Sequence, residues 1–125
     1  MVRRVNTTCA EGKIHHDIRM TGEFVTFLNS LEPKVRKKYL YVMQILKTEL
    51  VISEKFIKHL ENTELYEMRV SLSSNEYRTI IFSIDAVNII SSSKVLLLNS
   101  FLKKDTKQYR SEISRAMKLL EDWRT

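Results

Sequence analysis

The stretch Glu64–Lys107, ELYEMRVSLSSNEYRTIIFSIDAVNIISSSKVLLLNSFLKKDTK, contains three runs with the character of β-strands. Glu64–Leu72 alternates in side-chain type, so its residues divide between the two faces of a pleated strand. Glu76–Ile84 is dense in β-branched and aromatic residues, which are enriched in strands. Lys94–Leu102 is an almost unbroken apolar run. We therefore expect three strands in this part of the chain.

The connections between these runs predict how the strands pair. Ser73–Asn75 is short and polar, which suits a hairpin, and Asp85–Ser93 is longer and rich in Ser and Asn, which suits a wider turn. Strands joined in this way form an antiparallel meander.

Two arginines lie inside the predicted strands. Arg69 shares the face of Glu67, and its plainest interpretation is the solvent-facing partner in an alternating strand. Arg78 is in phase with the apolar residues Ile80 and Phe82. An arginine on an apolar face either pairs with a carboxylate or lines a cleft. The predicted sheet is therefore a platform that carries a cationic cluster.

Length and composition bound the class of protein. The chain has 125 residues, the size of a single domain spanning residues 1–125, with 21 Lys and Arg against 15 Asp and Glu and a net charge of +6. A small basic domain points first to polyanions such as nucleic acid and second to an acidic protein partner. A basic protein with no such partner is the plain alternative.

Cys9 is the only cysteine, so no internal disulfide forms, which fits a reducing compartment. No apolar run approaches the ~18 residues that a membrane span needs, and the N-terminus lacks the apolar core of a signal peptide. We expect a soluble, cytoplasmic protein with no membrane partner.

The first twenty residues carry little pattern. Met1–Thr8 is a candidate for a short edge strand. His15 and His16 are adjacent, and neighbouring histidines can bind a metal, but only Asp17 follows them as a potential ligand. We therefore assign no metal site.

Helical patterns follow. Thr21 is placed to cap a helix, and Pro33–Leu50 is predicted as a second helix with Pro33 in its first turn. The second helix has one apolar stripe at helical spacing: Val35, Tyr39, Val42 and Leu46. Ser53–Leu60 is predicted as a shorter third helix. The first two turns of the second helix contain four cations: Lys34, Arg36, Lys37 and Lys38. Three interpretations of this face stay open: it is simply solvated, it contacts phosphate, or it binds an acidic partner.

A last helix follows the strands. Asp105 or Thr106 caps it, and Asp105 with Gln108 has capping-box spacing. Its apolar stripe consists of Tyr109, Ile113, Ala116, Leu120 and Trp123. Helices thus precede and close an antiparallel sheet, which predicts an α+β domain.

The sequence contains no metal-binding, phosphate-loop, nucleotide-binding or Ser/His/Asp motif. His59, on the predicted third helix, is more simply a surface or core histidine than a catalyst. What remains is a group of cations and tyrosines: Arg69, Arg78, Lys103, Lys104, Lys107, Tyr77 and Tyr109.

Antiparallel pairing predicts how this group assembles. It puts the start of the second strand beside the end of the third, so that Arg78 faces Lys103 and Lys104. Arg69 approaches from the first strand, near the far end of its hairpin with the second. The amides at the start of the last helix can also receive a phosphate.

These motifs, in this order, resemble the RelE/ParE toxin superfamily. The segments that carry the resemblance are L-Y-E-M-R, E-Y-R-T-I-I-F, V-L-L-L-N-S-F-L-K-K-x-x-K and a final helix with E-I-x-x-A. The similarity extends from about Phe24 to Trp123 and is greatest to the phage-derived, HigB-like branch. Members often have Lys-Thr-Pro after the lysine pair, whereas here Lys107 is followed by Gln108. The resemblance implies a RelE-like fold, with N-terminal helices on a three- to four-stranded antiparallel sheet and a C-terminal helix.

The resemblance also implies a function. Such a protein is a type II toxin that a cognate antitoxin, a small helix-turn-helix or acidic protein, holds inactive, and it cleaves messenger RNA in the ribosomal decoding site. RNA is cut when its 2′-hydroxyl attacks the adjacent phosphate, so the endoribonuclease needs no metal or other cofactor. The protein positions the phosphate, stabilises charge and moves protons. Without a well-placed histidine, proton transfer falls to a lysine, a tyrosine or a carboxylate.

On this hypothesis the residues take three roles. The catalytic residues are Arg69, Arg78, Lys103 and Tyr109. The RNA-binding residues are Lys104, Lys107 and Arg110. The antitoxin-binding residues are Lys34, Lys37 and Lys38.

Two alternatives stay open. The ParE branch has the same fold but inhibits DNA gyrase and has no nuclease site. A phage-type structural or RNA-binding protein without toxicity is the other. Cations that converge on one sheet face favour the nuclease, whereas cations spread over the surface favour mere binding.

Overall fold

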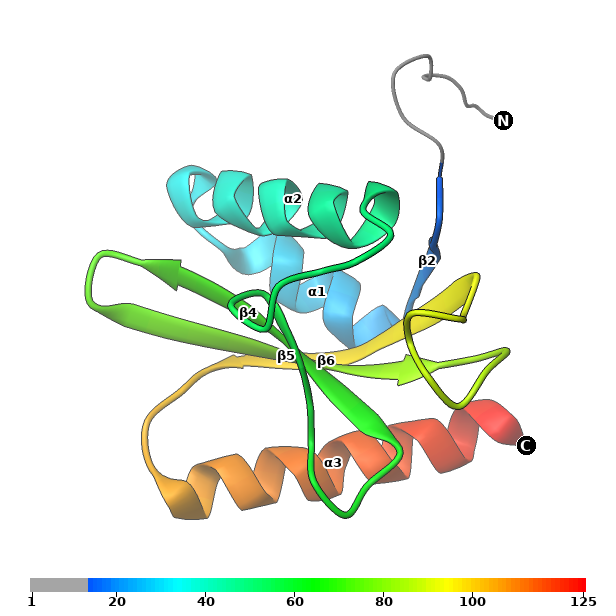
Figure 1. Cartoon of the computed structure of the whole chain (residues 1–125). Coiled ribbons are helices and arrows are strands. Elements are labelled where there is room, and N and C mark those ends of the chain that lie inside the picture. The colour runs from blue at the N-terminus through cyan, green and yellow to red at the C-terminus, as the bar shows by residue number, and fades with distance from the viewer. Residues whose placement is uncertain (1–13) are drawn as a thin grey trace.

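A computed structural model describes residues 14–125, so the predicted strand Met1–Thr8 lies outside the described residues. The elements are, in chain order, β2 (Asp17–Met20), α1 (Gly22–Ser30), α2 (Pro33–Thr48), β3 (Ile57–His59), β4 (Leu65–Leu72), β5 (Asn75–Ser83), β6 (Lys94–Leu102) and α3 (Thr106–Arg124). Figure 1 shows the elements in three layers, with α1 and α2 on one face of the sheet and α3 on the other. The α+β class is confirmed.

The sheet has five strands in the order β2-β6-β5-β4-β3. Strands β4, β5 and β6 form the predicted antiparallel meander, with bounds within one residue of those expected. The edges differ from the prediction. β3 adds an antiparallel strand beside β4, and β2 adds a parallel strand beside β6. The sheet is therefore mixed and has one or two strands more than expected.

The prediction of a helix over Ser53–Leu60 is wrong. The chain makes a turn at residues 54–56 and then enters β3, where Ile57 pairs with Met68 and His59 with Tyr66. A helix of this length is marginal on its own, whereas β4 presents an open edge of backbone donors and acceptors that a strand can pair with. Long-range pairing therefore overrides the local helical spacing.

The β2 strand was not predicted. Its four residues carry little alternation and are mostly exposed, and what holds them is pairing with β6, supported by a hydrogen bond from the Asp17 amide to the Ser93 carbonyl of 2.8 Å. A parallel partner so distant in sequence leaves no local signal.

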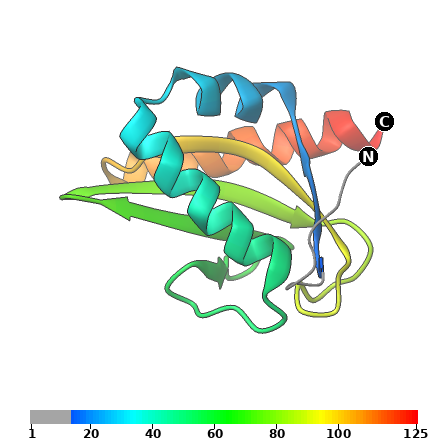
Figure 2. The same cartoon turned by 90° about the horizontal axis from the view of Figure 1, so that it is seen from above.

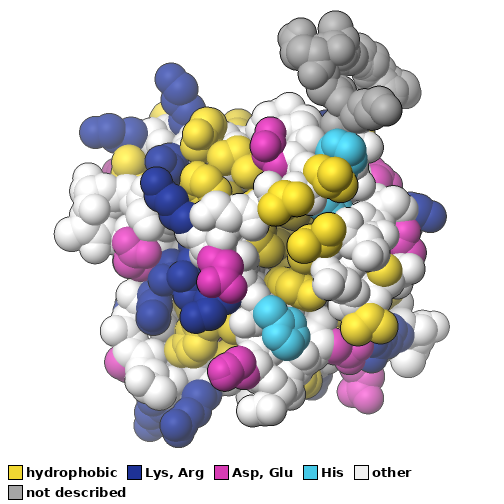
Figure 3. Space-filling model, in the orientation of Figure 1, with side chains coloured by type: hydrophobic (Ala, Val, Ile, Leu, Met, Phe, Trp, Pro, Cys, Tyr) yellow, Lys and Arg dark blue, Asp and Glu magenta, His cyan; other side chains and the backbone are white. Residues whose placement is uncertain are grey.

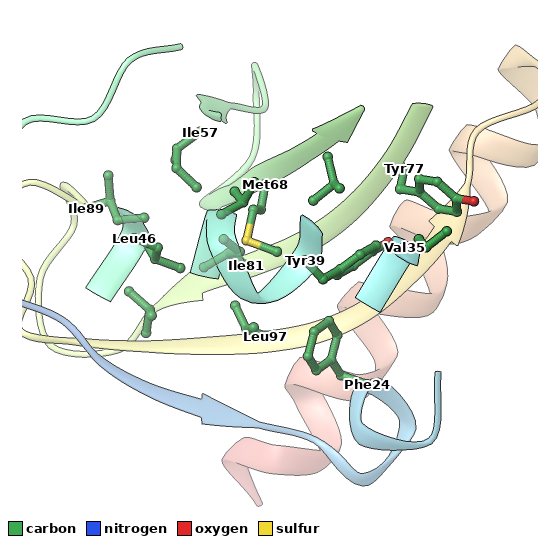
Figure 4. Close-up of a cluster of buried hydrophobic side chains, with 13 residues drawn as sticks. Phe24, Val35, Tyr39, Leu46, Ile57, Met68, Tyr77, Ile81, Ile89 and Leu97 are labelled. Carbon is green, nitrogen blue, oxygen red and sulfur yellow. The ribbon is translucent and has the colours of Figure 1, made fainter. Parts of the chain in front are cut away.

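Two apolar clusters separate the three layers. The first lies between the sheet and the helices α1 and α2, and Figure 4 shows Phe24, Tyr39 and Leu46 directed towards Met68 and Ile81 of the sheet. The predicted stripe of α2 is buried throughout, which confirms it. The second cluster lies beneath α3, where Ala116 and Leu120 are buried against the other face of the sheet and the predicted stripe residues Tyr109 and Ile113 pack on it.

Polar groups fix the ends of the helices as expected. Thr21 Oγ1 accepts a hydrogen bond from the Phe24 amide, and Asp105 Oδ1 accepts one of 2.8 Å from the Gln108 amide. Both are N-caps that satisfy otherwise unpaired amides. At the other end of α1, the Arg36 guanidinium donates to the carbonyl oxygens of Leu28, Asn29 and Leu31, so one of the four clustered cations of α2 serves the fold.

A β-bulge in β6 decides which residues face α3. Thr79 pairs with Ser100 while Ile81 pairs with Leu97, so two residues of β6 lie opposite one residue of β5. The alternation of β6 reverses at this point. After the bulge, Phe101 lies opposite Arg78 on the α3 face, and the lysine pair follows directly.

Figure 2, a view from above, shows α1 and α2 lying across the sheet, with the tip of the β4–β5 hairpin extending past the start of α2. Within residues 14–125, no helix has both the length and the apolar character of a membrane span.

The loop between β5 and β6 is held by one carboxylate. Asp85 accepts hydrogen bonds from the hydroxyls of Ser92 and Ser93 and from the amides of Ser93 and Lys94. The serine hydroxyls first, and then these amides, hold the pKa of Asp85 well below its usual range.

We predict that Asp85→Asn lowers the melting temperature by a few degrees at neutral pH. Because the folded-state pKa is lower than the unfolded value of about 3.9, the carboxylate contributes its full stabilisation above roughly pH 5 and loses it as the pH falls towards the folded pKa. The gap between the parent and the variant should therefore narrow below about pH 4. Thermal unfolding followed by circular dichroism over this range checks it, with the exposed Asp122→Asn as control; a gap that is independent of pH contradicts it.

Candidate active site

The candidate site is built around a buried carboxylate on β4. Glu67 is only 2% exposed and points to the α3 face of the sheet. Arg69, two residues on and therefore on the same face, places Nε 2.7 Å from Glu67 Oε2. Arg78 lies directly opposite Arg69 on β5, with Nε 3.6 Å from the same oxygen. One carboxylate thus compensates two guanidinium groups within the sheet.

Tyr109, in the first turn of α3, completes the cluster. Its hydroxyl donates a hydrogen bond to Glu67 Oε1. Its ring packs edge-to-face on Phe101, and Lys103 Nζ lies 5.5 Å from the ring centroid. Burial, followed by the bond to Glu67 and the charge of Glu67, raises the pKa of Tyr109 far above its ordinary value. The phenol is therefore protonated at neutral pH and tied to the carboxylate.

The two arginines differ in what they present to solvent. The side chain of Arg78 is 8% exposed, and its Nη1 donates to Glu76 Oε1 at 3.2 Å and to the Tyr77 carbonyl at 3.0 Å. Glu76 also accepts a hydrogen bond from the Ser71 hydroxyl, and this bond, followed by the contact with Arg78, lowers the pKa of Glu76. Arg69 is 29% exposed, and among the described residues its terminal Nη atoms have no hydrogen-bond partner. Arg69 is thus the arginine that can receive an external anion.

A group of exposed cations adjoins this cluster along the chain, and one of them, Lys103, contacts the Tyr109 ring. Four exposed cations, which we call the cationic rim, follow β6 or begin α3 and form no ion pair with any described residue: Lys103, Lys104, Lys107 and Arg110. The Lys103 amide donates to the Glu76 carbonyl at 2.8 Å, which extends the β5–β6 pairing by one position. Lys103 thus lies across from Glu76, and Arg78 faces Phe101 and not the lysine pair as predicted. The Gln108 side chain bridges the turn, accepting from the Lys104 amide and donating to the Leu102 carbonyl.

The structure brings together the four residues predicted to be catalytic: Arg69, Arg78, Lys103 and Tyr109. The predicted position of Arg69 needs correction, because it lies directly across from Arg78 rather than towards the far end of the hairpin. Tyr77 does not join the cluster. It lies on the other face of the sheet and packs edge-to-face on Tyr39 at 5.7 Å, beneath α2.

Sequence reasoning missed the residue at the centre of the site. Glu67 shares the face of Arg69 and lies in phase with the buried Leu65, so it is a carboxylate in a position that favours burial. A buried carboxylate needs a partner, and the two strand arginines were the available ones. That combination was the signal that could have identified it.

The histidines lie elsewhere. His16 is buried, with Nδ1 2.7 Å from the Leu46 carbonyl oxygen and Nε2 2.8 Å from that of Ile89. It therefore links the residue before β2 to α2 and to the β5–β6 loop. His59 lies on β3, not on a helix, with its ring against Tyr66. Both line a hollow whose other walls are largely apolar and include Ile57; yellow side chains surround it near the centre of Figure 3. The residues that line this hollow form no ion cluster like the one around Glu67.

Comparison with models of known protein families gives a match over most of the chain. The model of the family of phage-derived, Gp49-like proteins matches residues 26–121, which include every residue of the Glu67 cluster and of the cationic rim. No curated protein matches the chain.

We predict that Glu67→Gln destabilises the protein by about 3 kcal/mol, because removing one partner of a buried ion pair leaves Arg78 poorly compensated. Glu76→Gln, a matched change at the half-exposed partner of Arg78, should cost less than about 1 kcal/mol. Urea unfolding measures both. In Glu67→Gln the pKa of Tyr109 should also fall towards its ordinary value of about 10 without reaching it, since burial remains. Tyrosinate absorbance during alkaline titration reports that change, and equal stabilities of the two variants would contradict the central role of Glu67.

Proposed function

The chain belongs to the Gp49-like family of phage-derived proteins, a RelE/ParE-like toxin family of toxin–antitoxin systems, and on that premise we propose that it is a metal-independent endoribonuclease that cleaves messenger RNA on the ribosome. Membership in such a family implies an antitoxin partner. The observation that carries the nuclease proposal is the Glu67 cluster, in which a tyrosine, a carboxylate and an outward-facing arginine meet beside the exposed Lys103.

The proposed reaction is transesterification within the RNA. The 2′-oxygen attacks the adjacent phosphorus, a new P–O2′ bond forms, and the P–O5′ bond breaks. The proton of the 2′-hydroxyl goes to a base on the protein, and the leaving 5′-oxygen takes a proton from an acid. The products are a 2′,3′-cyclic phosphate and a 5′-hydroxyl. No metal, oxidant or other co-reactant enters this balance, and a protein accelerates it by positioning and by stabilising charge.

Arg69 is suited to hold the phosphate. Its Nε is fixed by Glu67, and the two Nη atoms at the other end of the planar guanidinium are available for a bidentate contact with phosphate oxygens. Arg78 is largely buried and already engaged, so in this proposal it positions Glu67 and adds positive potential instead of contacting the RNA. This division of labour replaces the equal roles that the sequence alone assigned to the two arginines.

The Tyr109–Glu67 pair is suited to move the proton. Glu67 is too deeply buried to reach a ribose directly, and Tyr109 with its raised pKa is a poor base by itself. Joined by a hydrogen bond, they act together: Tyr109 accepts the 2′-hydroxyl proton as it passes its own proton to Glu67. Lys103, over the Tyr109 ring, is positioned to supply the proton for the leaving oxygen.

The exposed cations at the start of α3 then hold the flanking RNA backbone. Lys104, Lys107 and Arg110 are free of internal ion pairs among the described residues, so their charge is available to phosphates. Contacts of this kind give affinity that falls steeply with salt and carries no sequence preference.

We predict that the protein, induced without its antitoxin, arrests bacterial growth and reduces intact messenger RNA. Primer extension on a translated message should show cuts within the reading frame, at codon boundaries, and the same message without a start codon should remain intact. Growth arrest with intact messages and altered DNA supercoiling would replace the nuclease with a gyrase inhibitor. If cells grow normally while folded protein is shown to be expressed, both the nuclease and the gyrase inhibitor are excluded.

We predict that Arg69→Ala lowers the cleavage rate by about 10²–10³, the usual effect of losing one donor to a developing charge. Arg110→Ala, a matched loss of an exposed arginine in the cationic rim, should mainly raise KM and make the dependence of KM on salt shallower, because one phosphate contact is lost. Single-turnover cleavage separates the rate of the chemical step from binding. Equal effects of the two substitutions on the chemical step would remove Arg69 from the site.

A further inference from the structure

Helix α2 carries a positive charge that nothing in the described chain neutralises. Its sequence, PKVRKKYLYVMQILKT, contains no Asp or Glu, and no cation of this helix forms an ion pair with a described residue. Arg36 is engaged with the carbonyl oxygens at the end of α1. The other three cations of its first two turns, Lys34, Lys37 and Lys38, have no such engagement. Figure 3 shows dark-blue side chains gathered at the upper left, over the region where α2 begins in Figure 1.

Two aromatic rings continue this charged surface. Tyr41, one helical turn beyond Lys38, is 56% exposed, and it packs edge-to-face on Phe56 from the turn before β3 at 6.5 Å. A lysine lies over each ring, with Lys38 Nζ 5.4 Å from the centroid of Tyr41 and Lys55 Nζ 5.6 Å from that of Phe56. We call these four residues the Tyr41 platform. Its cations come from two different elements and meet at a pair of rings.

We propose that the Tyr41 platform is a second RNA-binding surface, which takes single-stranded RNA by stacking a base on Tyr41 and placing phosphates on the flanking lysines. Aromatic rings interleaved with cations bind single strands without strong sequence preference. One nucleotide supplies both partners, a base for a ring and a phosphate for an ammonium group. An incoming phosphate draws Lys38 away from the Tyr41 ring and frees the ring face for the base.

The arrangement favours RNA over the acidic antitoxin that the sequence assigned to these lysines. An amphipathic protein segment binds by inserting apolar side chains into a groove. On α2 the exposed aliphatic side chain is Leu40, whereas Leu50 and Ile90 lie at the hollow lined by His16 and His59. One such side chain is less than the row of apolar anchors that an amphipathic segment uses. Lys38 of α2 and Lys55 instead each lie over a ring, and a ring offers a base a flat surface.

The platform is separate from the Glu67 cluster. Helix α2 packs on one face of the sheet, and Glu67 with Tyr109 lies on the other. A strand held on α2 is thus a different segment of RNA from the one at Glu67, and the proposal does not depend on any cleavage reaction.

The test uses the full chain and a fluorescent 2′-O-methyl RNA of roughly 12 nucleotides, within the footprint typical of single-strand binders. This probe cannot be cut, because its 2′-oxygen is blocked, so binding is measured whether or not the protein is a nuclease. Tyr41→Ala should weaken binding about tenfold, the usual effect of losing one stacked base. The pair Lys38→Gln and Lys55→Gln should make the salt dependence, log K against log salt, shallower by about 1.4.

Matched controls separate the platform from general charge and from folding. Lys118→Gln removes an exposed cation of α3, and Leu40→Ala removes an exposed side chain beside Tyr41; both should bind the probe as the parent does. Tyr41→Leu keeps an apolar contact for Phe56, so a loss of binding in this variant at unchanged melting temperature assigns the effect to stacking.

Three outcomes overturn the proposal. The first is unchanged affinity in both the Tyr41 and the lysine variants. The second is an equal loss in Lys118→Gln, which would mean diffuse attraction of a polyanion. The third is that an acidic amphipathic peptide, and not the RNA probe, binds in a Tyr41-dependent way, which would return this surface to a protein partner. Stronger binding of single-stranded than of duplex probe, lost in Tyr41→Ala, supports it.

Discussion

The ion cluster on Glu67 connects the parts of this protein that matter for its chemistry. A carboxylate removed from water loses much of its hydration, and this cost is offset only when strong partners surround it. Glu67 has three, from β4, β5 and α3, and each comes from a different part of the chain. The same contacts that make its burial tolerable fix Arg69, Arg78 and Tyr109 relative to one another. Stability and the geometry of the site therefore depend on one side chain.

The placement of the remaining charge follows from this. Arg78 forms ion pairs with Glu67 and Glu76, and Arg36 donates hydrogen bonds to carbonyl oxygens at the end of α1, so these two cations stabilise the fold. The lysines at the end of β6 and along α2 have no such partners among the described residues. The cations without ion-pair partners among the described residues thus include two groups, one on each side of the sheet. Potentials of this kind attract polyanions from a distance and leave specificity to the groups nearby.

The bulge in β6 determines which residues of this strand face the site. In a regular strand, the alternation set by Val95 and Leu97 would turn Phe101 towards α2. The extra residue reverses that alternation, so Phe101 and Lys103 both lie on the α3 face, against Tyr109. Asn99, in the bulge, donates to the backbone and side chain of Glu112 and so holds α3 against the strand. The packing of α3 and the assembly of the cluster are parts of one arrangement.

The sequence by itself determined the meander, the helices α1, α2 and α3, the N-caps of α1 and α3, and the face on which Arg78 lies. Period, capping residues and turn composition are local properties, which is why they can be read from the sequence. It also indicated that Arg69, Arg78, Lys103 and Tyr109 belong together, through antiparallel pairing and family resemblance. Only the tertiary structure decided that Ile57–His59 is a strand, that Asp17–Met20 pairs in parallel with β6, and that Glu67 is the centre of the cluster. Those outcomes depend on an open sheet edge, a distant partner and a bulge, which are interactions between segments far apart in the chain and leave no periodic trace in any one of them.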